Sequence, residues 1–250
     1  MSTSAVDRRR GLQTVADILV APRSAFAALR EFPTWVWAYL IGAALLMLGT
    51  FALGPALQHA LDASLPGQLL ASPNIAKLSP DQQQKTIANI MATQRTIVGL
   101  TWIFPPFFIL IAGLMQSTVM LVANAVGHGD GSFRKFWALA INVQVAGALG
   151  GIVTAAIVLV RGANSFERST DLQAVLPNLG MLAPGAPPIL AAVLTALNVA
   201  ALWQTALLAL GMIAVARIAA VPAWVAAGLM LLTLCAFAAF GANAQLRAAS

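Results

Sequence analysis

Few side chains of this 250-residue chain can act as a general base or a metal ligand, since it has two histidines, one cysteine and eight carboxylates. His59 and His128 lie near the ends of apolar stretches, and they are not spaced to hold zinc. Cys235 stands alone, which excludes a disulfide within the chain and a cysteine metal cluster. We therefore expect no catalytic residue, no metal and no cofactor.

One short motif has a chemical meaning in other proteins. Gly127-x-Gly129-Asp130 matches the G-x-G-D string of intramembrane aspartyl proteases. That chemistry needs two facing carboxylates that share a proton, and no second Asp or Glu lies inside an apolar stretch. The string is also a weak phosphate cradle, because no strand precedes it. We interpret these residues as a flexible, glycine-rich turn.

Six amide side chains are the polar groups that fall inside long apolar stretches. They are Gln116, Asn124, Asn142, Gln144, Asn198 and Gln204. Amides at membrane depth usually form hydrogen bonds between helices, and none of these can carry a proton or a net charge. Ion-coupled carriers place ionisable groups in their spans, so proton coupling is not expected. Two interpretations stay open, namely contacts between helices and an amide-lined path for a solute.

The apolar stretches themselves are defined by the distribution of charge. Fourteen Lys and Arg and eight Asp and Glu leave five long gaps that contain no charge at all. A helix that crosses a hydrocarbon core ~30 Å thick needs roughly 20 apolar residues, so each gap can hold one span. We predict an all-α polytopic membrane protein with five transmembrane helices, at about 35–57, 97–126, 136–160, 188–216 and 222–242.

Composition supports the same class of protein. The chain is 60% hydrophobic and 9% charged, with a mean hydropathy of +0.84, whereas soluble domains carry about 25% charged residues. The formal net charge of +6 does not indicate a nucleic-acid partner, because the basic residues sit at the ends of the spans. The expected partners are the lipid bilayer and either other membrane proteins or a second copy of the chain.

The segments outside the spans also have a helical pattern. Residues 1–34 form an N-terminal cytoplasmic or interfacial segment, in which 12–31 is amphipathic and Pro22 starts a second short helix. This segment either lies on the membrane surface or packs on the bundle. The membrane domain follows at 35–242, and a short tail occupies 243–250.

Prolines mark two further features. Pro105 and Pro106 interrupt the second predicted span, and a helix kink is expected there because proline removes a backbone donor and clashes with the preceding turn. The kink could serve a transport path or only shape the bundle. The longest loop, 58–95, contains a helix start at Ser79-Pro80-Asp81.

Orientation follows from the basic residues. A cytoplasmic N-terminus puts eight of them inside and six outside, and the inside residues flank the first span and two short turns, which carry most weight. The C-terminus then lies outside. The inside residues are Arg8, Arg9, Arg10, Arg23, Arg30, Arg134, Lys135 and Arg217, and the outside residues are Lys77, Lys85, Arg95, Arg161, Arg168 and Arg247.

Several stretches together resemble one family. Residues 18–26 (ILVAPRSAF), followed by 35–37 (WVW), are similar to the segment that precedes the first span of Yip-domain proteins. The turn at 127–134 and Trp203 with the leucines after it are similar to later parts of the same family. The resemblance extends over residues 12–241. A departure is the sequence NVQVA at 142–146, where members often carry a proline.

The resemblance implies a non-enzymatic membrane protein that acts through helix–helix or protein–protein contacts. Eukaryotic members bind small GTPases, but the alanine-rich, lysine-poor composition is typical of bacterial proteins, so that role is not carried over. A bacterial inner membrane is the expected location. The alternative is a small permease or channel subunit that uses the Pro105-Pro106 kink and the amides.

Overall fold

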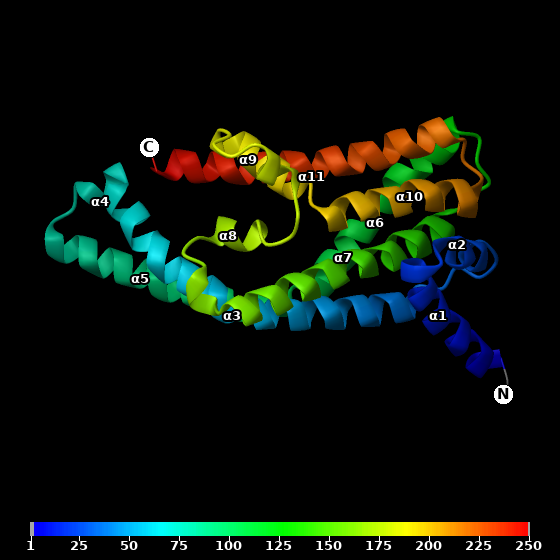
Figure 1. Ribbon diagram of the computed structural model, residues 1–250, viewed down its shortest axis with the longest axis horizontal. Coiled ribbons are helices and arrows are strands. Elements are labelled where there is room, and N and C mark those ends of the chain that lie inside the picture. Colours follow the sequence, from blue (N-terminus) through cyan, green and yellow to red (C-terminus); the bar gives the residue numbers. More distant parts are fainter. Residues whose placement is uncertain (1–2, 250) are drawn as a thin grey trace. The chain divides into compact units, whose positions relative to one another are not determined.

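The computed structural model describes residues 3–249, and the side chains of 11–168 and 170–244 within them. The described residues are mainly helical and contain no β-strand. The longer helices are α1 Thr3–Val20, α2 Pro22–Glu31, α3 Val36–Ala71, α5 Pro80–Leu100, α6 Pro105–Val126, α7 Phe133–Arg161, α9 Pro188–Ala196, α10 Val199–Ala216 and α11 Ala220–Ala249 (Figure 1). The short elements are α4 Pro73–Ala76, α8 Ser169–Gln173 and the 3-10 turns η1 Thr101–Ile103, η2 Ala163–Ser165 and η3 Leu179–Leu182.

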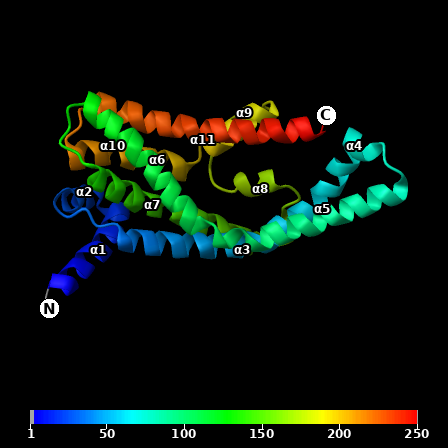
Figure 2. The same ribbon diagram turned by 180° about the vertical axis from the view of Figure 1, so that it is seen from behind.

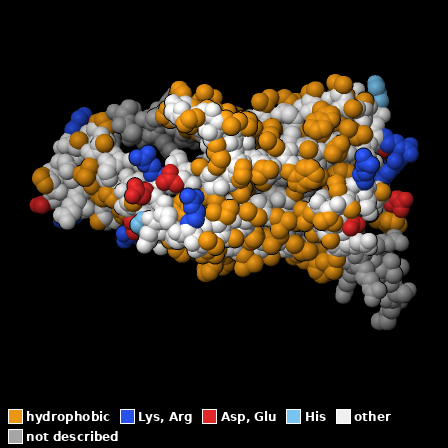
Figure 3. All heavy atoms as spheres, viewed as in Figure 1, with side chains coloured by type: hydrophobic (Ala, Val, Ile, Leu, Met, Phe, Trp, Pro, Cys, Tyr) orange, Lys and Arg blue, Asp and Glu red, His pale blue; other side chains and the backbone are white. Residues whose placement is uncertain are grey.

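Five of these helices are long and apolar enough to cross a membrane: α3, α6, α7, α10 and residues 220–244 of α11. Large apolar side chains remain exposed along them, and Figure 3 shows hydrophobic side chains over much of the visible surface. Such a surface is typical of helices that face lipid, and the prediction of an all-α, five-span membrane protein in contact with a bilayer is confirmed.

The chain forms two compact units. The first consists of Met1–Met47, Phe104–Gly151 and Val199–Thr233, and the second of Leu48–Ile103, Ile152–Asn198 and Leu234–Ser250. Helices α3, α7 and α11 continue from one unit into the other without interruption.

The core of the first unit joins α2, α6, α7, α10 and α11. Phe136 and Leu139 of α7 are fully buried there, together with Leu207 and Met212 of α10. Phe26 of α2 is also buried in this cluster, and both ribbon views show α2 beside α10 (Figures 1 and 2). Helices of this unit therefore pack around large apolar side chains close to the turns that connect them.

The N-terminal segment forms two helices, and α2 begins at Pro22 as predicted. Its apolar residues Ala25, Phe26 and Leu29 are buried in the first unit's core. Of the two alternatives for 12–31, the structure therefore has the apolar face of α2 packed on the bundle and not on lipid. Arg23, on the same helix, remains exposed.

The second unit has a smaller core. It contains Ala56 of α3, Val158 of α7, Phe166 and Leu172. A salt bridge of 3.0 Å joins Arg95 of α5 to Asp62 of α3. This contact links the helix predicted to start at Ser79 with the end of the first long helix.

Three predicted spans differ from the observed helices. The first was expected to end near residue 57, but α3 continues through Pro55 and Pro66 to Ala71. Its extension is rich in Ala, Leu and Gln, which have high helix propensity, and an interior proline removes one hydrogen bond without ending the helix here. The first part of the predicted loop 58–95 is therefore helical.

The predicted kink at Pro105-Pro106 is instead a break between two helices. Helix α5 ends at Leu100, η1 follows, and Pro105 and Pro106 occupy the first turn of α6. A first-turn proline loses no helical hydrogen bond, whereas within a continuous helix each ring would clash with the turn before it. The second span accordingly begins at 105, not at 97.

The fourth predicted span is also broken, into α9 and α10, at Leu197 and Asn198. The Leu197 carbonyl accepts a hydrogen bond from the N–H of Leu179 at 3.3 Å, and Asn178 pairs with Asn198 as an isolated antiparallel bridge. A partner from a distant loop satisfies the backbone at the break. Only α10 is long enough to span.

Candidate functional site

Two turns of the first unit are joined by backbone hydrogen bonds. The N–H of Asp130 donates to the carbonyl of Ala216 at 2.8 Å, and the N–H of Ala219 donates to the carbonyl of Gly127 at 3.4 Å. The first turn, Gly127–Ser132, connects α6 to α7, and the second, 216–219, connects α10 to α11. We call this pair of turns the turn clasp. It fixes residues that the sequence pattern had indicated to be a flexible turn.

The local sequence explains how the turns fit together. His128 and Arg217 have positive φ angles, 51° and 52°, a conformation that ends a helix tightly. The Asn124 Oδ1 atom accepts a hydrogen bond from the N–H of Gly131 at 2.9 Å. A Cβ atom at Gly131 would collide with the ring of Phe136. Glycine is thus required at this position because the turn lies directly against the core.

The carboxylate of Asp130 lies among three cationic side chains of the first unit. Its oxygens are 3.7 Å from Arg30 Nη2, 3.7 Å from Lys135 Nζ and 3.9 Å from Arg217 Nε. The Asp130 side chain is 48% exposed, so water screens each pair and each contributes modestly. Figure 3 shows Lys and Arg side chains gathered near α2 and the α10–α11 turn. One acid thus offsets part of a basic surface.

Replacing Asp130 with asparagine should destabilise the protein by about 1 kcal/mol at low salt, because three exposed ion pairs lose their common anion. The loss should shrink at high salt, since screening weakens the original pairs. Chemical unfolding of the purified protein in mild detergent at two salt concentrations measures both effects. Asp62→Asn is the control, since among the described side chains Asp62 has a single ion-pair partner, Arg95. An Asp130→Asn variant as stable as wild type at low salt contradicts the prediction.

The surroundings of Asp130 do not fit aspartyl-protease chemistry. Its carboxylate is paired with Arg30, Lys135 and Arg217, which favours the charged form and not a proton shared with a second carboxylate, and it lies in a turn between spans. In the part of the chain that the structure describes, no three His, Cys, Asp or Glu side chains are grouped to bind a metal ion. The arrangement holds two turns together, and it presents positive charge.

Two of the predicted amide residues donate to backbone carbonyls of other segments. Asn142 is buried, and its Nδ2 donates to the carbonyls of Thr34 and Ala138, both at 2.8 Å. The Nε2 of Gln144 donates to the Ile109 carbonyl of α6 at 3.1 Å. Asn142 therefore ties α7 to the α2–α3 connection, and Gln144 ties α7 to α6.

The other amides lie apart from these two. Asn124 supports the turn clasp. Gln204 packs so closely on Gly147 that a side chain at Gly147 would overlap its amide. The Oε1 atom of Gln116 is buried and finds no hydrogen-bond partner within the described residues. Asn198 belongs to the second unit. The six amides thus occupy separate environments.

Asn198 is one of the lining residues of a mainly apolar pocket within the second unit. It has a volume of about 340 Å³, and the polar side chains in its lining are Thr154, Gln173, Thr195 and Asn198. Hydroxyl and amide groups of this kind can hydrogen-bond to an uncharged solute. The helix break between α9 and α10 brings Asn198 to this pocket.

Sequence reasoning missed the grouping of cations around Asp130. The signal available was modest, namely a lone acid with Arg134 and Lys135 four and five residues after it. The contributions of Arg30 and Arg217 depend on the packing of α2 and on the turn clasp. Only the folded chain brings these side chains together.

Comparison with known proteins gives one match. The family profile described as Yip1 domain matches residues 16–242, which is nearly the whole chain. Comparisons with curated proteins and with solved structures gave no match. The matched range includes α2, four of the apolar helices and most of the fifth, α11.

Proposed function

The chain belongs to the Yip1 domain family, and from that premise we propose that it is a non-enzymatic membrane protein that acts through helix–helix or protein–protein contacts. The observation that carries this proposal is the use of Asn142. Both hydrogen bonds of its Nδ2 go to backbone carbonyls, and its side chain is buried. An amide used in this way holds helices together and has no donor left for a solute.

Charge supports the same proposal. Helix α7 has no charged side chain between Lys135 and Arg161, whereas pumps and ion-coupled carriers place ionisable groups inside their spans. Exposed charges of the first unit lie instead at α2, the turn clasp and the start of α7, where a soluble or membrane-bound partner can reach them. Contacts in the membrane and at this basic surface are therefore the proposed mode of action.

Affinity purification of the tagged full-length chain from native membranes in mild detergent tests the proposal. We expect a partner, or a second copy of the chain, in a fixed ratio that survives a change of detergent. Mass spectrometry of the eluted material gives identity and ratio. Recovery of the chain alone, as a monomer by light scattering, would argue against action through protein contacts.

Asn142→Leu should destabilise the purified protein by roughly 1–2 kcal/mol, because two hydrogen bonds of about 0.6 kcal/mol or more each are lost and the Thr34 carbonyl loses its donor. Unfolding in mixed detergent micelles measures this change. Thr233→Val is the control, since the Thr233 hydroxyl bonds only to Leu229 of its own helix. A different result would indicate a solute path. In that case the wild type would carry glycerol or ribitol into liposomes, and Asn142→Leu would abolish this flux without changing stability.

A small permease or channel subunit is the second candidate function, and the pocket around Asn198 favours it. Under this alternative, wild-type liposomes should take up glycerol or ribitol faster than protein-free liposomes. Asn198→Leu and Thr195→Val should remove that difference, because they replace polar lining groups with apolar ones. Under the first proposal, wild-type and protein-free liposomes should behave alike.

We also propose that the N-terminus is cytoplasmic and the C-terminus outside, in the cell membrane of a bacterium. The basic residues of α2, the start of α7 and the α10–α11 turn support this orientation, since positive charge close to the spans stays on the cytoplasmic side. The turn clasp and its basic surface then face the cytoplasm.

A further inference from the structure

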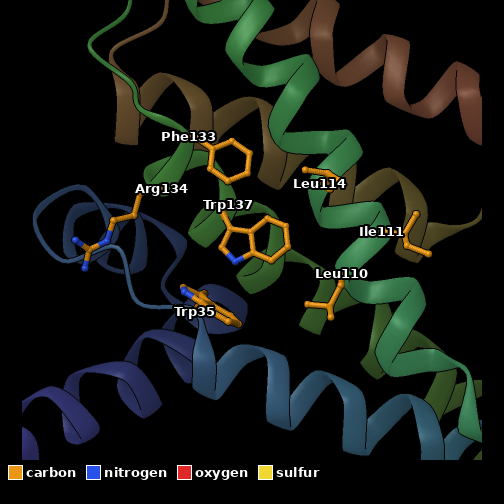
Figure 4. A pocket seen from close by; sticks show the side chains of 7 residues that line it. All are labelled: Trp35, Leu110, Ile111, Leu114, Phe133, Arg134 and Trp137. Atoms are coloured by element: carbon orange, nitrogen blue, oxygen red, sulfur yellow. The ribbon is translucent and has the colours of Figure 1, made fainter.

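An open, apolar groove lies in the first unit at the start of α3 and α7. Its volume is about 560 Å³, within the roughly 300–1,000 Å³ of typical small-molecule sites. We call it the tryptophan groove (Figure 4), and its lining consists of Trp35, Leu110, Ile111, Leu114, Phe133, Arg134 and Trp137.

One wall of the groove is aromatic. Trp35 and Trp137 meet edge to face with centroids 5.8 Å apart, and Phe133 stacks on Trp137 at 6.0 Å. Neither indole N–H donates a hydrogen bond to a described residue, and both indole nitrogens lie on the side nearer Arg134 in Figure 4. Tryptophan is enriched where an apolar body meets a wetter layer, so this wall suits the boundary between acyl chains and headgroups.

The opposite wall is the outward face of α6. Ile111 and Leu114 are 54% and 52% exposed, whereas Ile109 and Gly113 on the other face are buried. In a membrane-spanning helix this outward face meets hydrocarbon. The groove is therefore open to the acyl chains of the surrounding lipid.

Arg134 adds the only charge to this lining. Its side chain is exposed, and Figure 4 shows its guanidinium directed away from the aromatic rings, at one end of the groove. Asp130 pairs with Arg30, Lys135 and Arg217, and Arg134 has no ion-pair partner within the described side chains. A free guanidinium at the end of an apolar groove complements an anion that is attached to an apolar chain.

We propose that the tryptophan groove binds one anionic phospholipid of the bilayer. Its acyl chain lies between the two tryptophans and α6, and its phosphate accepts hydrogen bonds from Arg134, whose planar fork matches phosphate oxygens. An apolar helix of another protein would fill the groove but leave this guanidinium without a counter-ion. A lipid bound in this groove adds to the proposed contacts with proteins and does not depend on them.

Native mass spectrometry of the delipidated full-length protein tests this site. The protein in mild detergent is titrated with phosphatidylglycerol and, separately, with phosphatidylcholine of the same chains. We expect one phosphatidylglycerol per chain to bind at least tenfold more tightly than the rest. Arg134→Gln should weaken this binding about tenfold or more, because a charge-assisted hydrogen bond is lost. Leu114→Trp should abolish it by filling the groove.

Two matched controls separate the groove from general effects. Arg23→Gln removes an exposed charge of the same unit outside the groove, and Met115→Trp adds the same bulk at a neighbouring exposed position. Both should bind like wild type. If Leu114→Trp does not fold, Ile111→Phe takes its place. Equal binding in Arg134→Gln and Arg23→Gln, or equal affinity for both lipids, would overturn the proposal.

The oligomeric state provides the last criterion. Light scattering should give the same mass for wild type and Leu114→Trp, since a lipid and not a protein fills the groove. If the wild type is a dimer and Leu114→Trp is a monomer, a second copy of the chain occupies the groove. The proposal of a lipid site would then be wrong.

Discussion

Replacing Phe136 with alanine should lower the free energy of unfolding by about 3–5 kcal/mol, the usual cost of removing a fully buried phenylalanine ring. The ring is fully buried in the first unit's core. It also lies against Gly131, so its loss would leave the turn clasp without support. A cavity at this position cannot collapse easily, because α7, α10 and the turn clasp meet there. Unfolding of the purified variant in mixed detergent micelles measures the change.

Phe107→Ala is the matched control. Phe107 is on α6 in the same unit and is 61% exposed. Its ring meets lipid, which is as apolar as the protein interior, so truncation should cost less than about 1 kcal/mol. A Phe136→Ala variant no less stable than Phe107→Ala would show that the core does not depend on this ring.

Gly211→Ala should destabilise the protein by about 1–3 kcal/mol, the usual cost of overpacking a core. A Cβ atom at Gly211 would collide with the side chain of Leu139, which is fully buried. Gly211 is on α10 and Leu139 on α7, so the close approach of these two helices depends on the missing side chain. The same unfolding measurement applies.

Gly228→Ala is the control for this change. Gly228 lies in α11, also in the first unit, and a Cβ atom there meets nothing within 4 Å. Alanine is a better helix former than glycine by about 1 kcal/mol, so this variant should be as stable as wild type or more so. If the free energy of unfolding falls in Gly211→Ala but not in Gly228→Ala, packing and helix propensity are separated. A fall in both variants, or in neither, would contradict the packing argument.

The number of spans could be predicted from the sequence because the bilayer imposes it. A charge inside hydrocarbon is costly, so the gaps between charges had to coincide with the apolar helices. Pro22 likewise marked the start of α2, since proline favours the first turn of a helix. Rules of this kind act along a single stretch of chain, and they need no knowledge of the fold.

The breaks in the helices could not be predicted in the same way. Leu197 and Asn198 leave the helix because a backbone N–H from Leu179 satisfies the freed carbonyl. Conversely, α3 continues past Pro55 although proline usually indicates an end. In each case a distant contact or the surrounding helix formers outweighed the local pattern.

The partners of the candidate residues depended on the fold as well. The sequence left two interpretations open for amides such as Asn142, contacts between helices and a path for a solute, and it could not identify the Thr34 carbonyl as an acceptor. Asp130 belongs to a G-x-G-D string that is catalytic in intramembrane aspartyl proteases, and the string does not reveal its partners in this fold. The three cations that pair with Asp130 come from α2, α7 and the α10–α11 turn. Backbone acceptors and exposed charges leave no periodic signal.

The turn clasp has a consequence for biosynthesis. The N–H of Asp130 pairs with the carbonyl of Ala216, which a ribosome adds about ninety residues later, on the order of ten seconds at typical elongation rates. Until Ala216 is added, the backbone N–H of Asp130 has no clasp partner and is exposed to water at the membrane surface. The clasp can therefore close only late in membrane insertion, after α10 and the start of α11 have been synthesised.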